Sequence, residues 1–503
     1  MKKELVFILG AAVLGTVCFS NLTADKVSAK TSGDYKYVVT GKKKKTCAIR
    51  KYTGKETDVT VPEKLDGYTV TRIGNQAFAR NRKIKSVTLP KRVTKIGKKA
   101  FIFCDKLKEV NLSDNIHTIE SEAFDECYRL ENITLPSKLK KIGSYAFFDC
   151  SIKDLYIPQY LEKIGDSSFR NNSLDSIAVD EKNKKFDSRE DCNAMIERLT
   201  NTIVLGSNKT TVPSTVTAIG EDAFYNCRKL KEITIPAGVK TIGENAFQHC
   251  ASLEKVIISE GLTDIGEFAF GSCGSLKEVK FPDSLETIGS KAFEYCKSLN
   301  SIYIPKNLKK TEDLRDKFWG AGIKSITVAD GNPYYDSRDN CNGVIETSSN
   351  TLVLACENTN IPKTVKIIGE FAYVTFPSEL IIPEGVEELS EGALCGCETT
   401  EKITLPSSLK SIGPYAFAHC YLLKEITIPE GITEIKESTF NCCEALEEIT
   451  LPSSLTVIES CITGSSYKME TVNYRGSIAQ WKKIKISDYD ILEELYINYN
   501  YKG

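Results

Sequence analysis

IGEDAFYNCRKLKEITIPAGVKTIGENAFQHCASLEKVIIS, residues 219–259, contains one pattern twice. The pattern IG-x-x-AF-x-x-C-x-x-L starts at Ile219 and starts again 23 residues later at Ile242. A fixed period of this length is typical of a solenoid, in which each repeat forms one rung and buries its apolar side against its neighbours. We therefore expect one elongated body, although 503 residues would otherwise suggest about three globular domains.

Each repeat divides into three pieces. The segment KEITI alternates polar and β-branched residues, which predicts a short strand that ends at Pro236 because proline cannot donate to the next ladder bond. The segment VKTIG predicts a second short extended piece that turns at Gly243. The segment ENAFQHC predicts a helical turn whose alanine, phenylalanine and cysteine face the core.

The repeat occupies most of the chain but not all of it. Residues 30–70 lack the pattern and alternate apolar and polar residues around glycines, which predicts an antiparallel cap for the first rung. The tail predicts a second cap, with a short helix near 478–483 and a strand near 495–499. The expected organisation is a signal peptide at 1–29, an N-terminal β cap at 30–70, repeat blocks at 71–179, 213–329 and 363–470, insertions at 180–212 and 330–362, and a C-terminal cap at 471–503.

The two insertions are copies of one segment. KFDSREDCNAMIERLTNTIVLGSNKTTVP and YYDSRDNCNGVIETSSNTLVLACENTNIP share their polar start and their apolar end at a spacing of 149 residues. The same spacing relates Phe169 to Phe318 and Phe224 to Tyr373, so several repeats were copied together with the insertion. The turn-forming Asp, Asn and Ser residues explain the polar run better than a calcium loop does.

The N-terminus and the charge set the compartment and the class of partner. Lys2 and Lys3, an apolar run from Leu5 to Phe19 and a small-residue site at 27–29 predict a secretory signal peptide. The apolar run is shorter than the roughly 20 residues that span a bilayer, so we expect no membrane insertion after its removal. The net charge of −1 argues against a strongly basic nucleic-acid binder.

Most of the 18 cysteines stand at one position of the repeat. A column of small buried thiols in the core is favoured over metal binding or catalysis, and a ladder of disulfides is the alternative. Cys395 and Cys442, which lie beside column members, could form local disulfides or none. The column consists of Cys104, Cys127, Cys150, Cys227, Cys250, Cys273, Cys296, Cys397, Cys420 and Cys443.

Nothing in the sequence predicts an enzyme, a metal site or a cofactor. Only three histidines are present, and His249 and His419 each precede a column cysteine. Neighbouring residues of a helical turn point in different directions, and a Cys-His nucleophile would also need an orienting group and an oxyanion site. Zinc would need clustered ligands, and the sequence has no Gly-rich phosphate loop.

LPSSLKSIGPYAFAHCYLLKEITIPEGI, residues 405–432, resembles the BspA-like, or Treponema-type, leucine-rich repeats. The resemblance spans about residues 60–475 and rests on the joint pattern of IG, AF, Cys and I-x-I-P. It implies a repeat solenoid of the right-handed, curved leucine-rich class on a secreted or surface protein of a bacterium. It also implies roles in adhesion to host matrix proteins, coaggregation and host signalling, without shared catalytic residues.

The expected binding surface is the concave strand face, at the position between the two apolar residues of each strand. Threonine dominates this position, which is typical of a strand surface in contact with water. Tyrosine offers a large contact area, although cross-strand packing is the plainer explanation. The candidate contact residues are Thr234, Lys280 and two tyrosines that each lie two rungs before an insertion, Tyr156 and Tyr303.

These features predict an exported, non-enzymatic interaction protein. We expect a monomer that binds a protein or glycan on host or microbial surfaces, needs no cofactor and does not bind nucleic acid. The alternative is a module that captures carbohydrate for separate enzymes.

Overall fold

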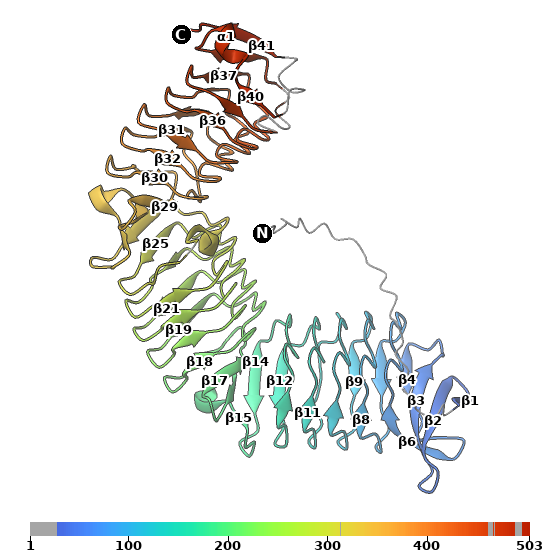
Figure 1. Ribbon diagram of the computed structural model, residues 1–503. Coiled ribbons are helices and arrows are strands. Elements are labelled where there is room, and N and C mark those ends of the chain that lie inside the picture. Colours follow the sequence, from blue (N-terminus) through green and yellow to red (C-terminus); the bar gives the residue numbers. More distant parts are fainter. Residues whose placement is uncertain (1–27, 312, 461–465, 467, 488–494, 503) are drawn as a thin grey trace.

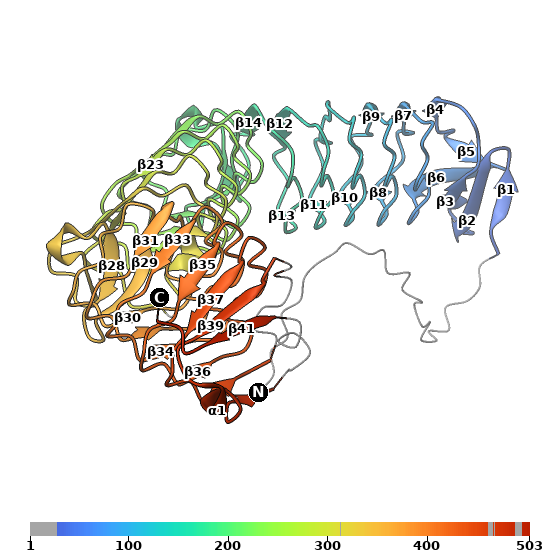
Figure 2. The same cartoon turned by 90° about the horizontal axis from the view of Figure 1, so that it is seen from above.

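The computed structural model is a curved stack of rungs, with a cap at each end (Figure 1). It describes residues 28–502 except 312, 461–465, 467 and 488–494. Most of the predicted signal peptide therefore lies outside the described residues. Figure 2, turned by 90° from Figure 1, shows that the stack also curves in this second view. The predicted solenoid with a period near 23 residues is confirmed.

The segment that ends in I-x-I-P forms parallel strands on one side of the stack, which we call the long ladder. Within each of its sheets a strand pairs with the same segment of the next rung, as Ile233 does with Val256. The long-ladder strands are β4 (Asp58–Thr60), β7 (Ser86–Thr88), β9 (Glu109–Asn111), β12 (Asp154–Ile157), β14 (Ser176–Val179), β19 (Glu232–Ile235), β21 (Lys255–Ile258), β23 (Glu278–Val279), β25 (Ser301–Ile304), β26 (Ser325–Val328), β31 (Glu379–Ile381), β33 (Lys402–Thr404), β35 (Glu425–Thr427), β37 (Glu448–Leu451), β39 (Thr471–Tyr474) and β41 (Tyr496–Tyr499).

The segment before each IG glycine forms a second parallel ladder, the short ladder. Most of its strands have two residues, and the second is an apolar side chain that points into the core. The short-ladder strands are β6 (Tyr68–Ile73), β8 (Lys95–Ile96), β10 (Thr118–Ile119), β11 (Lys141–Ile142), β13 (Lys163–Ile164), β18 (Ala218–Ile219), β20 (Thr241–Ile242), β22 (Asp264–Ile265), β24 (Thr287–Ile288), β30 (Ile367–Ile368), β32 (Glu388–Leu389), β34 (Ser411–Ile412), β36 (Glu434–Ile435), β38 (Val457–Ile458) and β40 (Lys485–Ile486).

The N-terminal cap and both insertions share one topology. In each, antiparallel strands lead into a strand that pairs in parallel with the first short-ladder strand of the following block. The same bond closes all three, because the glycines at 74, 220 and 369 donate to the carbonyls of Ile49, Ile203 and Leu352. These strands are β1 (Lys30–Ser32), β2 (Tyr35–Gly41), β3 (Thr46–Tyr52), β5 (Lys64–Leu65), β15 (Phe186–Asp187), β16 (Met195–Glu197), β17 (Thr202–Leu205), β27 (Tyr335–Asp336), β28 (Gly343–Glu346) and β29 (Thr351–Ala355).

Helix is nearly absent from the described residues. The C-terminal cap contains α1 (Ile478–Trp481), which Ser477 caps, and this helix and β41 confirm the predicted tail. Three short 3-10 helices span Arg189–Asp191, Arg315–Phe318 and Arg338–Asn340.

The predicted helical turn in each repeat is wrong. In ENAFQHC the residues Asn245 and His249 have φ of 53° and 63°, in the left-handed region. A helix would pair its N–H groups within the turn, whereas here the N–H groups of Asn245, Phe247 and His249 donate to carbonyls of the next rung. The turns therefore form a third side of the solenoid, on which successive rungs are joined by backbone hydrogen bonds. Residues that tolerate a left-handed backbone, such as asparagine, recur in these turns.

Stacked phenylalanines fill the core beneath these turns. Phe247 is fully buried, and its ring lies 4.7 Å from that of Phe224 and 5.0 Å from that of Phe270. A similar column runs from Tyr52 to Phe169 in the first block. The inward phenylalanines thus join each rung to both of its neighbours.

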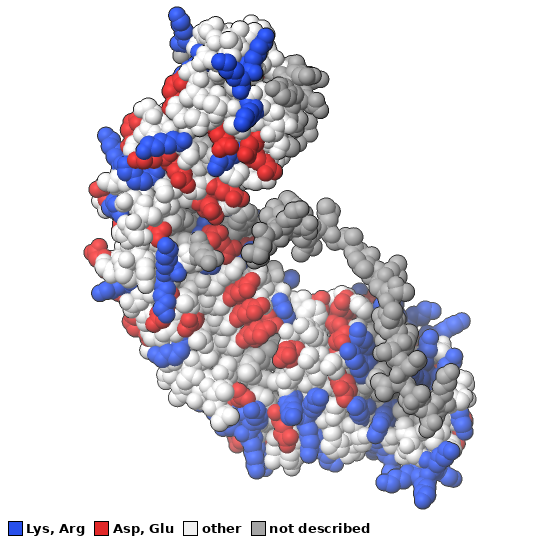
Figure 3. Space-filling model, viewed as in Figure 1, with Lys and Arg blue, Asp and Glu red and all other residues white. Residues whose placement is uncertain are grey.

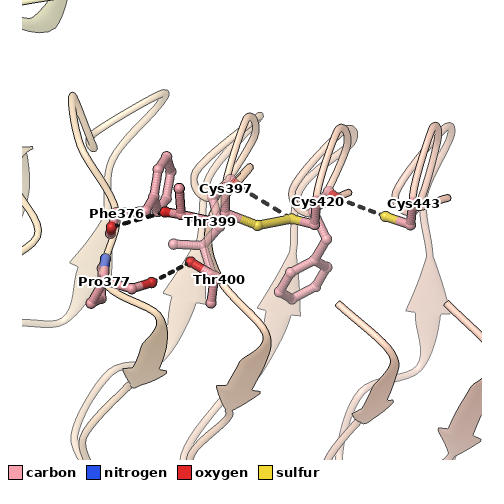
Figure 4. The surroundings of a disulfide bond; sticks show 9 residues. Phe376, Pro377, Cys397, Thr399, Thr400, Cys420 and Cys443 are labelled. Carbon is pink, nitrogen blue, oxygen red and sulfur yellow. Dashed lines mark hydrogen bonds between the residues drawn. A yellow bond between two sulfur atoms is a disulfide. The ribbon is translucent and has the colours of Figure 1, made fainter. Parts of the chain in front are cut away.

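The column cysteines hydrogen-bond as well as pack. The thiol of Cys250 donates to the carbonyl of Phe224 on the preceding rung at 3.2 Å, and six other column thiols make the equivalent bond. Ser466 takes this role on a later rung, where its hydroxyl donates to Phe440. Buried thiols are the rule, as predicted, and one inter-rung disulfide joins Cys397 to Cys420 (Figure 4). Cys395 and Cys442 are free and half-buried.

Each insertion separates two hydrophobic cores. Met195 and Leu205 pack into the core of the first block, whereas Ile196 and Ile203 on the same strands pack into the core of the second. The second insertion divides its neighbours in the same way. Successive side chains of a strand point to opposite faces, so one hairpin closes one core and starts the next.

We expect Gly206→Ala to destabilise the second block by about 1–3 kcal/mol. A Cβ atom at position 206 would lie 2.1 Å from the ring of Phe224, which is buried under the hairpin. Gly274→Ala is the matched control, because a Cβ atom there has nothing within 4 Å. Urea unfolding measures both, and equal stabilities of the two variants would contradict the close contact at Gly206.

Candidate functional site

The long ladder of the second block presents one continuous row of side chains to solvent. Thr234, on β19, pairs with Ile257, on β21, and the row continues through Lys280 after β23 to Tyr303 on β25. These four residues occupy successive rungs of one five-stranded sheet. The structure thus brings Thr234, Lys280 and Tyr303 onto one surface.

Ile257 was not singled out by the sequence, yet it is the apolar centre of this surface. Its side chain is 38% exposed, at a position where threonine is common. A hollow of about 400 Å³ opens beside it, lined by residues of β21 and β23 and by Lys280. The sequence did carry a signal for this residue. Ile257 is an isoleucine at an outward strand position, where contact with water favours polar residues.

Tyr303 is held in place at the edge of this row. Its hydroxyl donates to Asp283 at 3.2 Å, and the same carboxylate accepts from the backbone N–H of Lys306. Desolvation and the carboxylate of Asp283 raise the pKa of Tyr303, so its hydroxyl stays protonated at neutral pH. The ring is half-buried against the sheet and is fixed before any ligand arrives.

Tyr156 lies apart from the other candidates. It stands on β12 in the first block, in the sheet β12–β14, and it is 55% exposed because its cross-strand neighbour is Ala178. Its hydroxyl donates to Asp180 at 3.0 Å. Tyr156 and Tyr303 are therefore equivalent in sequence but belong to separate surfaces.

Beside the row from Thr234 to Tyr303, residues of opposite charge form ion pairs between neighbouring rungs. Glu232 pairs with Lys255 at 3.5 Å, and Glu254 pairs with Lys277 at 2.6 Å, each across one rung. The hydrogen bond from Lys277 lowers the pKa of Glu254. These ion pairs between rungs leave the border of the hollow close to neutral.

A second long-ladder position outside this block exposes an apolar residue. Ile381 on β31 is 62% exposed, the most exposed isoleucine among the described residues. By contrast Thr450 and Asn473, at the equivalent position near the C-terminal cap, are buried, and Asn473 bonds to Glu448 and Asn498. The open surface therefore does not extend along the whole ladder.

The insertions form two further hollows, of about 430 and 500 Å³. Their shared residues bind one another, since Arg189 donates to both carboxylate oxygens of Asp187 and to Asn201. Arg338 makes the same bonds with Asp336 and Asn350. The recurrence of this motif is explained by these internal bonds.

The structure does not bring the thiol of Cys250 and the ring of His249 together. The thiol of Cys250 faces the Phe224 carbonyl, while the ring of His249 packs edge-on against Tyr225. Among the described ranges, no three His, Cys, Asp or Glu side chains are placed to hold a metal ion. None of the helices described is long and apolar enough to cross a membrane.

Several solved structures are similar to this chain. A leucine rich cell surface protein from Faecalibacterium prausnitzii is 26% identical, with 92% of this chain and 98% of that chain covered and a TM-score of 0.39. A leucine-rich repeat protein from Bacteroides ovatus is 22% identical over 95% of this chain and 100% of that chain, with a TM-score of 0.41. The pneumococcal vaccine antigen PcpA is 17% identical, with 95% of this chain and 99% of that chain covered and a TM-score of 0.36. A search of curated proteins finds no match.

A protein-family comparison covers most of the chain. The model of the BspA type leucine rich repeat region matches residues 52–189, 206–315 and 350–483, in six copies. These ranges contain the whole Cys column and the stacked phenylalanines except Phe318. The chain therefore belongs to the BspA-type leucine-rich repeat family.

Proposed function

We propose that this chain is an exported, non-enzymatic protein that binds macromolecules on host or microbial surfaces through the long ladder of its second block. The row Thr234, Ile257, Lys280 and Tyr303 carries the proposal. It combines an exposed apolar centre, an aromatic ring fixed by Asp283 and a hollow of about 400 Å³ on a rigid sheet. Aromatic and apolar anchors beside a polar rim are typical of protein interfaces.

Other features support export and a surface location. The predicted signal peptide would direct the chain out of the cytoplasm, and a cell surface protein of Faecalibacterium prausnitzii is among the solved structures similar to it. An elongated body with one rigid binding surface suits contact with a large partner, as in other repeat proteins.

We expect the double variant Ile257→Thr, Tyr303→Ala to weaken binding to its protein partner at least tenfold, because anchor residues commonly contribute about 2 kcal/mol each. The measurement is surface plasmon resonance against a panel of purified host matrix proteins and whole bacterial cells. Thr427→Ala, at the same ladder position in the third block, is the control. Unchanged binding in the double variant would place the contact elsewhere.

A carbohydrate-capturing module is the second candidate. The ring of Tyr156 is open to solvent and its hydroxyl is held by Asp180, which suits stacking on a saccharide. Binding on a glycan array that is lost in Tyr156→Ala, Tyr303→Ala, together with no binding to matrix proteins, would favour this candidate over the first.

A further inference from the structure

The charge of the chain is strongly uneven, although its net charge is near zero. Residues 30–100 contain 20 Lys and Arg but only five Asp and Glu, whereas residues 101–503 contain 43 Lys and Arg and 60 Asp and Glu. Figure 3 shows the blue side chains gathered round the N-terminal end and below β6, β8 and β11, with red ones over the middle rungs. Averaging over the whole sequence conceals this basic end.

The basic residues converge on the outer face of one sheet. The first sheet runs β1-β2-β3-β6-β8-β10-β11-β13, and its inner face packs on the core. Its strand register places Lys36 opposite Lys51, Arg72 opposite Lys95 and Lys141 opposite Lys163. Arg72 itself faces Ala48 on β3, so Lys36 and Lys51 lie further along the first strands, beside the line of the other four. We call these six residues the basic row. At about 4.8 Å per strand, the row extends over roughly 30 Å from β2 to β13.

Like charges directly opposite one another lower the stability of a sheet. The fold does not require them, because the same short-ladder position in the second block holds Ala218, Thr241, Asp264 and Thr287. In the third block it holds Ile367, Glu388 and Ser411. The basic row therefore lowers the stability of the sheet, and the fold does not need it. Residues that lower stability in this way are concentrated at functional sites.

Few of these cations are neutralised within the protein. Among the described residues, the basic side chains of residues 30–100 form ion pairs only at Lys95 with Glu120 and at Lys98 and Lys99 with Glu122. Most of the others are exposed, including Lys51, Arg72 and the Lys42–Lys45 turn. Apart from Lys95, the members of the row thus present positive charge that no described carboxylate neutralises.

The surroundings narrow the class of ligand. No large apolar side chain is exposed on the strands of the first sheet. The exposed Tyr145 and Tyr160 lie in the turns beside β11 and β13. A membrane-binding face would offer apolar anchors, and a single-stranded nucleic-acid site would offer aromatic rings for stacking. A series of cations on strands that expose neither kind of side chain suits a linear chain of sulfate or carboxylate groups.

We propose that the basic row binds an acidic polysaccharide, laid across the strands of the first sheet. This site is separate from the long-ladder surface of the second block, so either can fail without the other. The ligand is held by several charge-assisted contacts spread along the row, and its affinity falls as salt rises.

The test uses the full-length protein and a heparin oligosaccharide of defined length. We expect the variant Lys51→Thr, Arg72→Thr, Lys141→Thr, Lys163→Thr to bind it at least tenfold more weakly, with a shallower dependence of affinity on salt. None of these four residues forms an ion pair within the described residues, and threonine stands in the same row at Thr118. The melting temperature should stay the same or rise, because like-charge pairs are removed.

The control removes four exposed lysines from the later blocks, Lys297→Thr, Lys306→Thr, Lys363→Thr and Lys424→Thr, and should bind as the native protein does. Equal losses in the two variants would overturn the proposal, since net charge alone would then explain binding. So would equally tight binding of neutral dextran, of a DNA duplex or of phosphatidylserine vesicles. The variant Ile257→Thr, Tyr303→Ala should keep full affinity for the oligosaccharide.

Discussion

Raising the pH from 8 to 11 is expected to unfold this protein without any denaturant. Four column cysteines of the second block lie in its core, and burial raises the pKa of every one, to about 12 for Cys296. In the unfolded chain a thiol ionises near pH 9, so above that pH the unfolded state binds fewer protons and is favoured.

The expected size of this effect is large. Each buried thiol removes at most about 1.4 kcal/mol of stability per pH unit above pH 9, so the four together remove up to about 5–6 kcal/mol per unit. Typical domains are stable by only about 5–15 kcal/mol. Urea unfolding at a series of pH values, with a reducing agent present, measures the slope.

Cys250→Ser is the matched variant for this prediction. A serine hydroxyl can still donate to the Phe224 carbonyl, as Ser466 donates to Phe440, but it does not ionise in this range. The slope of stability against pH should therefore become shallower by about 1.4 kcal/mol per pH unit. An unchanged slope would show that the column thiols are not the groups that titrate.

Phe247→Ala is expected to destabilise the second block by about 3–5 kcal/mol. The ring is fully buried between Phe224 and Phe270, so its removal leaves a cavity and breaks two stacking contacts. Rungs of a solenoid gain their stability from their neighbours, so the loss should affect the flanking rungs as well.

Hydrogen exchange locates this loss along the chain. Faster exchange is expected between the two insertions, from β18 to β26, with little change in the first block, because the hairpin of the first insertion separates the two cores. Thr234→Ala, an exposed change on a neighbouring rung, is the control and should leave exchange unaltered. A uniform loss of protection over the whole chain would contradict the separation of the cores.

The sequence predicted the rungs because each depends on a strict local pattern. Strand positions such as Ile233 and Ile235 alternate with exposed residues, and Pro236 marks the strand end, so period and register were readable directly. The turn was mistaken for a helix because Ala246, Phe247 and Cys250 have spacings that fit a helix. Its backbone follows instead from bonds to the next rung, which a single unit does not reveal.

The candidate surface was predicted less completely. Outward positions such as Thr234 and Lys280 were identified from alternation, but the hollow beside Ile257 depends on how neighbouring rungs pack. The pairings within the basic row, such as Lys36 with Lys51 or Arg72 with Lys95, are set only by strand register. A count of charge over the whole chain cannot show such pairings.

The hairpins of the insertions explain how a protein of this kind can change its length. A solenoid that is cut at an ordinary rung exposes an apolar end, whereas a unit that carries its own hairpin arrives with that end already covered. The copy at a spacing of 149 residues includes such a hairpin, so one duplication could add a complete segment to the stack. The reach of the molecule can therefore grow in large, individually stable steps, while the binding surfaces of the older segments stay intact.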